Sequence, residues 1–237
     1  MIRTLIVDDE RHAREELEVL LLELGDIEIV GTCANAMEAV KAINHERPEL
    51  IFLDIKMPVI DGFTLLGMIE EEIMPYVVFV TAFDEYALKA FDEKTLDYLL
   101  KPVDPQRLAQ TMKKVHGALD NNEKPALPQA QINRIPCTSV NHIKLVDPQD
   151  VEYVHSDISG VHVFTAEGNY FSELTLKVLE GRAGLLRCHK QYLINPAKVD
   201  EIIPLENGMA EIKTIAGARL PVSRRCLQQV KAAFGLK

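Results

Sequence analysis

The sequence predicts two domains of different fold class: an α/β doubly wound domain with a five-stranded parallel sheet, followed by a mostly-β domain. In the first half, short apolar runs alternate with amphipathic segments, whereas the second half holds mainly short extended runs separated by turns. Between the halves, the stretch NNEKPALPQAQ at 121–131 is polar, holds two prolines and shows no periodicity. We therefore expect domains at 1–119 and 134–237, joined by a linker at 120–133.

The first domain is expected to contain five strands, at 4–7, 27–31, 50–53, 76–80 and 97–100. Four of them are almost continuously apolar, which is typical of strands buried on both faces of a parallel sheet. Apolar residues recur at helical spacing in three further segments, 11–24, 36–43 and 105–119. Pro105 suits the first turn of the last of these helices. The alternation of strands and helices implies right-handed crossovers and a doubly wound sheet.

The second domain is expected to be rich in strands, at 143–145, 151–155, 161–165, 169–171 and 209–215. Asn207-Gly208 lies between apolar runs and is a good signal for a hairpin turn. Only two segments, around 174–179 and 223–234, show helical patterns.

The composition is typical of a globular protein, with 47% hydrophobic and 26% charged residues. No apolar run approaches the ~20 residues that a membrane span needs, so no membrane insertion is expected. The first residues, MIRTLIVDDE, become acidic within eight positions and do not resemble a secretion signal. The four cysteines form no CxxC pair, which favours buried free thiols in a reducing cytoplasm over a metal site.

Charge is distributed unevenly along the chain. Residues 1–119 hold 12 Lys and Arg against 23 Asp and Glu, whereas residues 120–237 hold 14 against 13. Within 187–231 the count is 8 against 4, so this stretch is locally basic. An acidic half joined to a locally basic half indicates two separate tasks, and the basic part is the one suited to a polyanion.

Polar side chains follow four of the five predicted strands. Asp8 and Asp9 follow the first, Asp54 the third, Thr81 the fourth and Lys101 the fifth. Ligands of open α/β sheets bind at the carboxyl ends of the strands, so these groups are expected to meet. Each group alone could be part of a turn, a helix cap or the surface. It is hard to obtain by chance four strands, in the right order, that are each followed by a suitable group.

Three carboxylates at one edge of a sheet repel one another unless a hard cation lies among them. Mg²⁺ prefers oxygen ligands and often bridges to a phosphate. We expect Asp9, Asp54 and the backbone carbonyl of Lys56 as direct ligands, with Asp8 as a ligand through water. Asp54 is the expected nucleophile toward a phosphoryl donor. Lys101 and Thr81 are expected to bind the phosphoryl oxygens.

The segments LIVDDE, FLDIKMPVIDG, FVTAFDEYALKAF and YLLKP resemble the signature segments of response-regulator receiver domains, over roughly residues 2–118. The resemblance implies a flavodoxin/CheY-like fold, Mg²⁺ as cofactor and phosphorylation of Asp54 by a sensor histidine kinase. It also implies a switch in which Thr81 moves toward the phosphate and Tyr98 turns inward. The face formed by residues 84–118 is implied as a surface for homodimerisation on phosphorylation.

Two basic clusters mark the second domain. One is RCHKQYLIN at 187–195, and the other is Ser223-Arg224-Arg225 at the start of the last predicted helix, with Ser223 as a plausible N-cap. Cations in the first turn of a helix oppose its dipole, so two arginines there indicate a phosphate or base-edge partner. A solvated charged surface is the alternative. The histidines of this domain lack metal-ligand spacing and are interpreted as surface or packed residues.

The segments LLRCHKQYLIN, ENG and LPVSRRCLQQVK resemble LytTR-type DNA-binding domains, from about residue 134 to 237. The resemblance implies contact with double-stranded DNA, in promoter direct repeats, through loops that enter successive major grooves. The residues implied in this contact are Ser159, Gly160, Arg187, His189, Lys190, Gln191, Ser223, Arg224 and Arg225. Over its whole length the chain resembles the BtsR/YehT-like subgroup of LytTR response regulators.

The expected function is that of a phosphorylation-controlled transcriptional regulator whose only chemistry is phosphotransfer and autodephosphorylation at Asp54. Two alternatives stay open. In the first, the second domain binds RNA or protein instead of DNA, and the charge argument does not distinguish DNA from RNA. Alternatively, the receiver would regulate an enzyme, although residues 134–237 offer no catalytic constellation that we can assemble.

Overall fold

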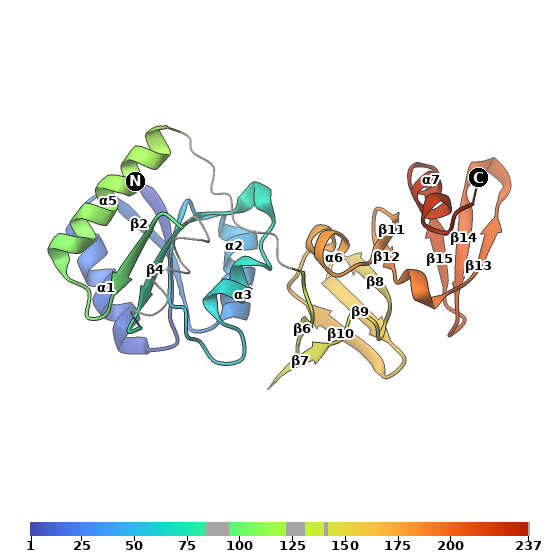
Figure 1. Cartoon of the computed structure of the whole chain (residues 1–237), viewed down its shortest axis with the longest axis horizontal. Helices are drawn as coiled ribbons and strands as arrows, with labels where there is room; N and C mark the ends of the chain where they lie inside the picture. Colours follow the sequence, from blue (N-terminus) through green and yellow to red (C-terminus); the bar gives the residue numbers. More distant parts are fainter. Residues whose placement is uncertain (84–94, 122–130, 140–141, 237) are drawn as a thin grey trace. The chain divides into compact units, whose positions relative to one another are not determined.

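The computed structural model describes residues 1–83, 95–121, 131–139 and 142–236. The chain divides into two units, Met1–Gln129 and Ala130–Lys237, and each is described separately (Figure 1). The centre of the predicted linker, residues 122–130, lies outside the described residues, so the linker bounds 120–133 remain a prediction.

A five-stranded parallel sheet forms the centre of the first unit. Its strands are β1 (Ile2–Val7), β2 (Ile27–Cys33), β3 (Leu50–Leu53), β4 (Tyr76–Thr81) and β5 (Asp97–Leu100). Their order is β2-β1-β3-β4-β5, the doubly wound arrangement of flavodoxin-like folds. The predicted α/β class and all five strands are confirmed, with β1, β2 and β4 longer than the apolar runs suggested.

Helices cover both faces of this sheet: α1 (Arg11–Glu23), α2 (Ala36–Glu46), α3 (Gly62–Leu66) and α5 (Pro105–Asp120), with a short 3-10 turn at Glu71–Ile73. Figure 1 shows α1 and α5 on one face and α2 and α3 on the other. Leu21 of α1 and Met112 of α5 share a buried cluster with Phe52 of β3. Pro105 occupies the first turn of α5, as predicted, where the carboxylate of Asp104 accepts a 2.8 Å hydrogen bond from Arg107 N.

An ionic network around the buried carboxylate of Asp97, which the sequence pattern did not predict, attaches α5 to β5. The carboxylate of Asp97 lies 2.6 Å from Nη2 of Arg107 and 3.0 Å from Nζ of Lys114. It also accepts a 2.7 Å hydrogen bond from the hydroxyl of Thr111. Burial would raise the pKa of Asp97, but the three donors outweigh it and hold that pKa well below its ordinary value.

Antiparallel strands dominate the second unit, and the predicted mostly-β class is confirmed. Its strands are β6 (Ile135–Thr138), β7 (Ile143–Val146), β8 (Val151–Asp157), β9 (Gly160–Thr165), β10 (Gly168–Ser172), β11 (Leu186–His189), β12 (Tyr192–Ile194), β13 (Val199–Pro204), β14 (Ala210–Thr214) and β15 (Arg219–Val222). They form a seven-stranded sheet, β11-β12-β8-β9-β10-β6-β7, and a three-stranded sheet, β13-β14-β15. Two helices complete the unit, α6 (Leu176–Arg182) and α7 (Arg224–Ala233).

Five of these strands, β6, β11, β12, β13 and β15, were not predicted. They are short or interrupted by polar residues, so their hydrophobic patterns are weak. The turn predicted at 207–208 is part of a 3-10 segment, Glu206–Gly208, which connects β13 to β14. Ser223 caps α7, since its hydroxyl accepts a hydrogen bond from Cys226 N at 3.3 Å.

A buried cluster holds the two sheets of this unit together beside α7 (Figure 1). It joins Cys188 of β11 and Ile212 of β14 to Val222 of β15 and Val230 of α7. All four cysteines are buried and unpaired, and burial raises the pKa of the Cys188 thiol to about 12. Among the described residues, no helix is long and apolar enough to cross a membrane.

Candidate functional site

Three carboxylates meet at the carboxyl ends of β1 and β3. The backbone of Asp54 is fixed beside β1, because its N–H donates to the carbonyl of Val7 at 2.8 Å. Asp8 and Asp54 are buried, whereas Asp9 is exposed. One carboxylate oxygen from each of Asp8, Asp9 and Asp54 lies within 4.8 Å of the others. These groups are the ones expected from the sequence to lie together.

Lys101 lies between two of these carboxylates. Its Nζ is 2.7 Å from Oδ2 of Asp8 and 2.9 Å from Oδ2 of Asp54. Burial favours the neutral amine, but the hydrogen bonds to both carboxylates outweigh burial and raise the pKa of Lys101. Burial raises the pKa of Asp8, and the charge of Asp54 adds to this effect against hydrogen bonds from Lys101 and the backbone of Glu10.

The cluster therefore carries more negative than positive charge. Three carboxylates face one ammonium group at the strand ends. This excess charge and its hard oxygen donors fit the ligand preferences of Mg²⁺.

Thr81 ends β4 with an unused hydroxyl. The side chain is fully buried, and its Oγ1 has no hydrogen-bond partner among the described residues. Leu53 pairs with Phe79, so Thr81 stands on the neighbouring strand next to the end of β3, where Asp54 follows. A buried hydroxyl without a partner costs about 1–3 kcal/mol, so this orientation suits an acceptor that the described residues do not provide.

The loop after Asp54 is shaped around that residue. The backbone N–H of Lys56 donates to Oδ1 of Asp54 at 3.3 Å. Gly62 packs so closely that a Cβ atom there would lie 2.6 Å from the backbone oxygen of Asp54. Glycine is therefore required at this position for the loop to approach the backbone of Asp54.

Tyr98 lies on β5, three residues before Lys101. It is half-buried, and its hydroxyl donates to the carbonyl of Phe83. In this structure Tyr98 is therefore held at the surface of the sheet end and does not lie inside the core. The segment that follows Phe83, residues 84–94, lies outside the described residues.

In the second unit, the three segments expected to face DNA are joined by backbone hydrogen bonds. Ser156, at the start of the β8–β9 turn, donates its N–H to the carbonyl of Gln191 in the β11–β12 turn at 2.9 Å. Ser223, the N-cap of α7, donates its N–H to the carbonyl of Cys188 at 3.0 Å. Segments that are far apart in the sequence therefore meet on one part of this unit.

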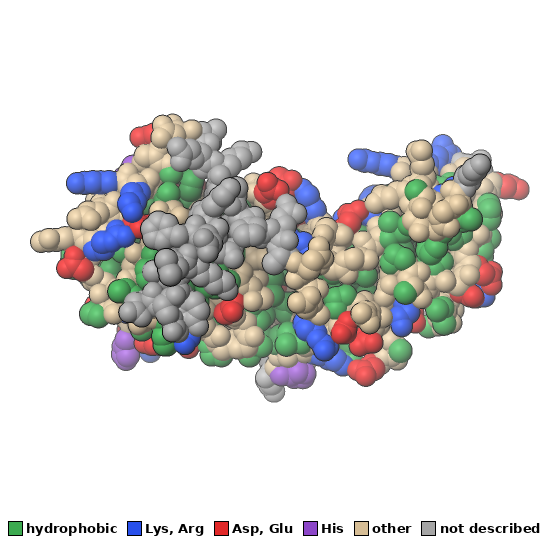
Figure 2. Space-filling model, in the orientation of Figure 1, with side chains coloured by type: hydrophobic (Ala, Val, Ile, Leu, Met, Phe, Trp, Pro, Cys, Tyr) green, Lys and Arg blue, Asp and Glu red, His purple; other side chains and the backbone are tan. Residues whose placement is uncertain are grey.

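The cations of this surface fall into two groups. Lys190, Arg224 and Arg225 are exposed, and the described residues give them no carboxylate partner. Arg187 differs, because its Nε and Nη2 lie 2.8 and 2.7 Å from Oε2 of Glu180 in α6. Figure 2 shows Lys and Arg side chains projecting from the part of this unit that carries α7. The unpaired cations suit a polyanion, whereas Arg187 fastens α6 to β11.

The other predicted residues are held by local contacts. His189 is half-buried, and its Nδ1 accepts a 3.3 Å hydrogen bond from the backbone N–H of Gln191. Burial lowers the pKa of His189, with further contributions from nearby Lys190 and His155. Gly160 has φ of +126°, and a Cβ atom there would lie 2.3 Å from the ring of Phe171. Its role in the turn is therefore steric.

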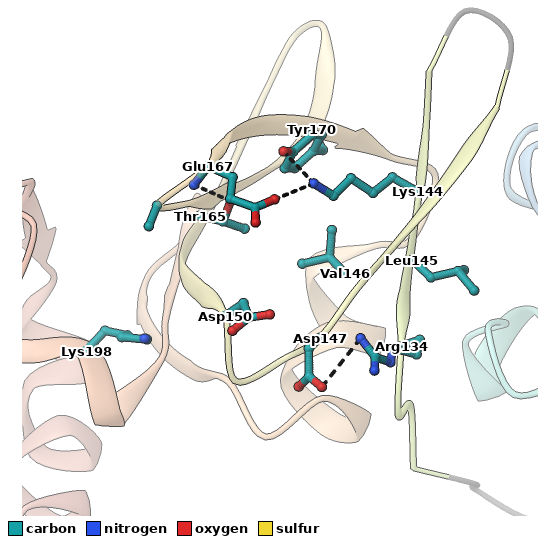
Figure 3. Close-up of a pocket in the computed structure, with 11 residues that line it drawn as sticks. Arg134, Lys144, Leu145, Val146, Asp147, Asp150, Thr165, Glu167, Tyr170 and Lys198 are labelled. Carbon is teal, nitrogen blue, oxygen red and sulfur yellow. Dashed lines mark hydrogen bonds and ion pairs between the residues drawn. The ribbon is translucent and has the colours of Figure 1, made fainter.

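A separate hollow of about 360 Å³ lies beside β6, β7 and the β9–β10 turn. Figure 3 shows that most of its charged groups pair with one another. Lys144 contacts Glu167 and the hydroxyl of Tyr170 at 2.7 and 2.8 Å, and Arg134 lies 3.6 Å from Asp147. Charges of both signs thus neutralise each other here, so this hollow is a poorer site for a polyanion than the surface beside α7.

Comparison with known proteins agrees with both halves of this geometry. Residues 4–113 match the family model of the response regulator receiver domain, and residues 141–235 match that of the LytTr DNA-binding domain. An uncharacterized response regulatory protein of Vibrio cholerae is 50% identical, over 99% of each chain. The transcriptional regulatory protein BtsR of Escherichia coli K12 is 49% identical, over 100% of each chain.

Proposed function

We propose, from the premise that this chain belongs to the LytTR family of response regulators, that phosphorylation of Asp54 controls its binding to DNA. A sensor histidine kinase would supply the phosphoryl group, and the LytTR domain would bind promoter DNA in a sequence-specific way. The output would be a change in transcription. Phosphotransfer at Asp54 would be the only enzymatic activity of the protein, and the protein would act in the cytoplasm.

The buried, partnerless hydroxyl of Thr81 beside Asp54 carries this proposal. A carboxylate oxygen of Asp54 would attack phosphorus, forming an acyl phosphate while the bond from phosphorus to the donor nitrogen breaks. Lys101, now bound to Asp54, would hold one phosphoryl oxygen through its ammonium group. Thr81 would donate its hydroxyl to another phosphoryl oxygen, which would satisfy a group that has no partner among the described residues.

The direct metal ligands that we propose are the carboxylates of Asp9 and Asp54 and the backbone carbonyl of Lys56, with Asp8 as a ligand through water and Mg²⁺ as the cofactor. Mg²⁺, when bound, supplies positive charge that offsets the negative charge of the phosphoryl group. Asp8 is held in this arrangement by hydrogen bonds from Lys101 and from the backbone N–H of Glu10 at 2.9 Å.

Thr81 and Tyr98 are proposed to transmit the signal. The hydroxyl of Tyr98 is now bound to the carbonyl of Phe83, close in sequence to Thr81. Movement of Thr81 toward a phosphate would release Tyr98 to turn inward, and the face formed by residues 84–118 would then pair in a homodimer. Sedimentation of the Mg²⁺–beryllofluoride form tests this step, and an unchanged monomer would contradict it.

For the DNA, the proposed contacts come from three segments: the β8–β9 turn with Ser159 and Gly160, the β11–β12 region with Arg187, His189, Lys190 and Gln191, and the α7 start with Ser223, Arg224 and Arg225. The exposed, unpaired cations Lys190, Arg224 and Arg225 support this choice. Direct repeats in a promoter would suit a dimer that places two such surfaces on one duplex.

Footprinting across genomic DNA tests the receiver, the output and their coupling together. Wild type treated with acetyl phosphate and Mg²⁺ is expected to protect discrete sites and to gain mass corresponding to one phosphoryl group. Asp54→Ala is expected to show neither the mass gain nor the phosphate-dependent protection. Asp120→Ala, which removes an exposed carboxylate at the end of α5, is the matched control.

A binding comparison of duplex DNA with duplex RNA, each over a salt titration, separates the main alternative. Preference for RNA, or equal binding of all sequences at moderate salt, would contradict a sequence-specific DNA-binding function.

A further inference from the structure

The most exposed large apolar side chain of the second unit lies at the tip of the β8–β9 hairpin. Asp157 pairs with Gly160, which leaves Ile158 and Ser159 as the two central residues of the turn. Ile158 has a relative exposure of 109%, so none of its surface is covered. Turns of this kind favour Asn, Asp, Gly or Ser, and their backbone gives no reason for a β-branched apolar residue.

The turn that presents Ile158 is tightly held. The carboxylate Oδ1 of Asp157 accepts hydrogen bonds from Ser159 N and Oγ, at 2.8 and 2.6 Å. The Ser159 hydroxyl also lies 2.8 Å from Nε2 of His162 on β9. Gly160 rests against the ring of Phe171. These contacts fix the backbone, so Ile158 projects into solvent in a defined direction and cannot fold back onto the sheet.

Exposed cations lie on the segments that backbone hydrogen bonds join to this hairpin. One residue before Asp157, the N–H of Ser156 binds the carbonyl of Gln191, the residue next to exposed Lys190. On the far side of the β11–β12 turn, Ser223 anchors the start of α7, which carries Arg224 and Arg225. The apolar side chain of Ile158 therefore belongs to the same set of joined segments as the exposed cations Lys190, Arg224 and Arg225, which suit phosphates.

We propose that Ile158 contacts the C5-methyl group of thymine in the major groove, and so determines part of the sequence specificity. This inference rests on the proposed DNA-binding function. In the major groove the thymine methyl is the apolar group that a base pair exposes, and the groove is wide enough to admit a two-stranded hairpin. The side chain of Ile158 has no hydrogen-bond donor or acceptor, so it makes no favourable contact with phosphates or with the polar edges of bases.

A comparison of thymine with uracil in the DNA tests this contact, because the two bases differ only by that methyl group. A promoter fragment identified by footprinting is prepared with dTTP or with dUTP, and the Kd of the full chain is measured for both. Wild type is expected to bind the uracil fragment roughly fourfold more weakly for each thymine methyl group that Ile158 buries. Single thymine-to-uracil replacements within the footprint then locate the base pair.

Ile158→Ala is expected to weaken binding to the thymine fragment and to reduce the thymine-to-uracil ratio of Kd values, with Ile158→Val intermediate. The comparison of ratios cancels any effect of uracil on DNA shape that both proteins share. Ile215→Ala is the matched control, because Ile215 is also an exposed isoleucine of this unit, at 65% exposure, and lies outside the three segments. Its ratio is expected to equal that of wild type.

Two contrary results have different meanings. Specific binding with the same thymine-to-uracil ratio in wild type and in Ile158→Ala would overturn the methyl contact alone. The absence of any specific footprint would overturn the proposed DNA-binding function, and the methyl contact with it.

Discussion

The ammonium Nζ of Lys101 lies 2.9 Å from Oδ2 of Asp54, so the proposed acceptor already carries the cation that would hold its phosphoryl group. Lys101→Met is expected to slow phosphorylation of Asp54 by acetyl phosphate by about 100-fold, as found when one preorganised donor to a developing charge is removed. The rate is measured by intact-protein mass spectrometry. Lys113→Met, at an exposed position of α5, should react at the wild-type rate. Normal phosphorylation of the Lys101 variant would contradict its role.

Thr81 and Thr111 are both fully buried, but within the described ranges only Thr111 has hydrogen-bond partners for its hydroxyl. Thr81→Ala should therefore leave thermal stability unchanged or increase it by about 1 kcal/mol, whereas Thr111→Ala should cost about 1–2 kcal/mol. Calorimetry of the full chain measures both. The Thr81 variant should also lose the effect of beryllofluoride on DNA binding. A large loss of stability in Thr81→Ala would show that its hydroxyl already has a partner.

We expect Asp97 to make the free energy of unfolding of the first unit depend on pH. Its hydrogen bonds to Arg107, Thr111 and Lys114 lower its pKa in the folded state against the opposing effect of burial. A lowered folded pKa stabilises the protein above the unfolded pKa of about 3.9, and this contribution is lost as the pH falls below it.

Asp97→Asn should therefore cost about 3 kcal/mol between pH 5 and 8, and this difference should shrink below pH 4. Thermal unfolding of both proteins across this range measures the effect. Asp120→Asn, at the exposed end of α5, should show no such pH dependence. A constant difference between wild type and Asp97→Asn down to pH 3 would contradict the assignment.

Arg224 and Arg187 should respond differently to the same substitution. Arg224 is exposed, and no carboxylate in the described part of the chain pairs with it. Arg224→Ala should therefore leave stability unchanged and weaken specific DNA binding by about 1–3 kcal/mol if it contacts a base. Equal weakening of binding to all DNA sequences would indicate a phosphate contact, and no change in binding would refute the assignment.

Arg187→Ala should instead destabilise the second unit, since Glu180 loses its partner. Melting curves and DNA titrations of both variants separate these effects.

The first unit could be predicted from the sequence because four of its five strands are almost continuously apolar, and the residue after each strand must lie at the sheet edge. The meeting of Asp8, Asp54 and Lys101 follows from that rule alone. The missing partner of Thr81 does not, because it depends on which way one hydroxyl points inside a packed core. The network around Asp97 was missed for a similar reason, since nothing in the pattern pairs it with Arg107.

The second unit was harder to predict because its polar surface depends on pairing between distant segments. β11 and β12 are only four and three residues long, and β11 alternates apolar residues with Arg187 and His189, so neither run is long enough to give a clear strand pattern. The family resemblance named Arg187 among the DNA contacts, and that assignment stays a prediction. In the structure the side chain of Arg187 is bound to Glu180, seven residues earlier, a pairing that spacing does not indicate.

The hydrogen bond from Ser223 to Cys188, with the buried cluster beneath it, has a consequence for control. The α7 start cannot shift without disturbing a strand of the larger sheet, and the β11–β12 turn is in turn fixed to β8. The three segments are therefore held together as one unit, and under the proposed function their fit to a DNA half-site would be set when the domain folds. A signal from Asp54 would then act on how many such domains reach a promoter together, through pairing and local concentration, and leave the intrinsic affinity of each nearly constant.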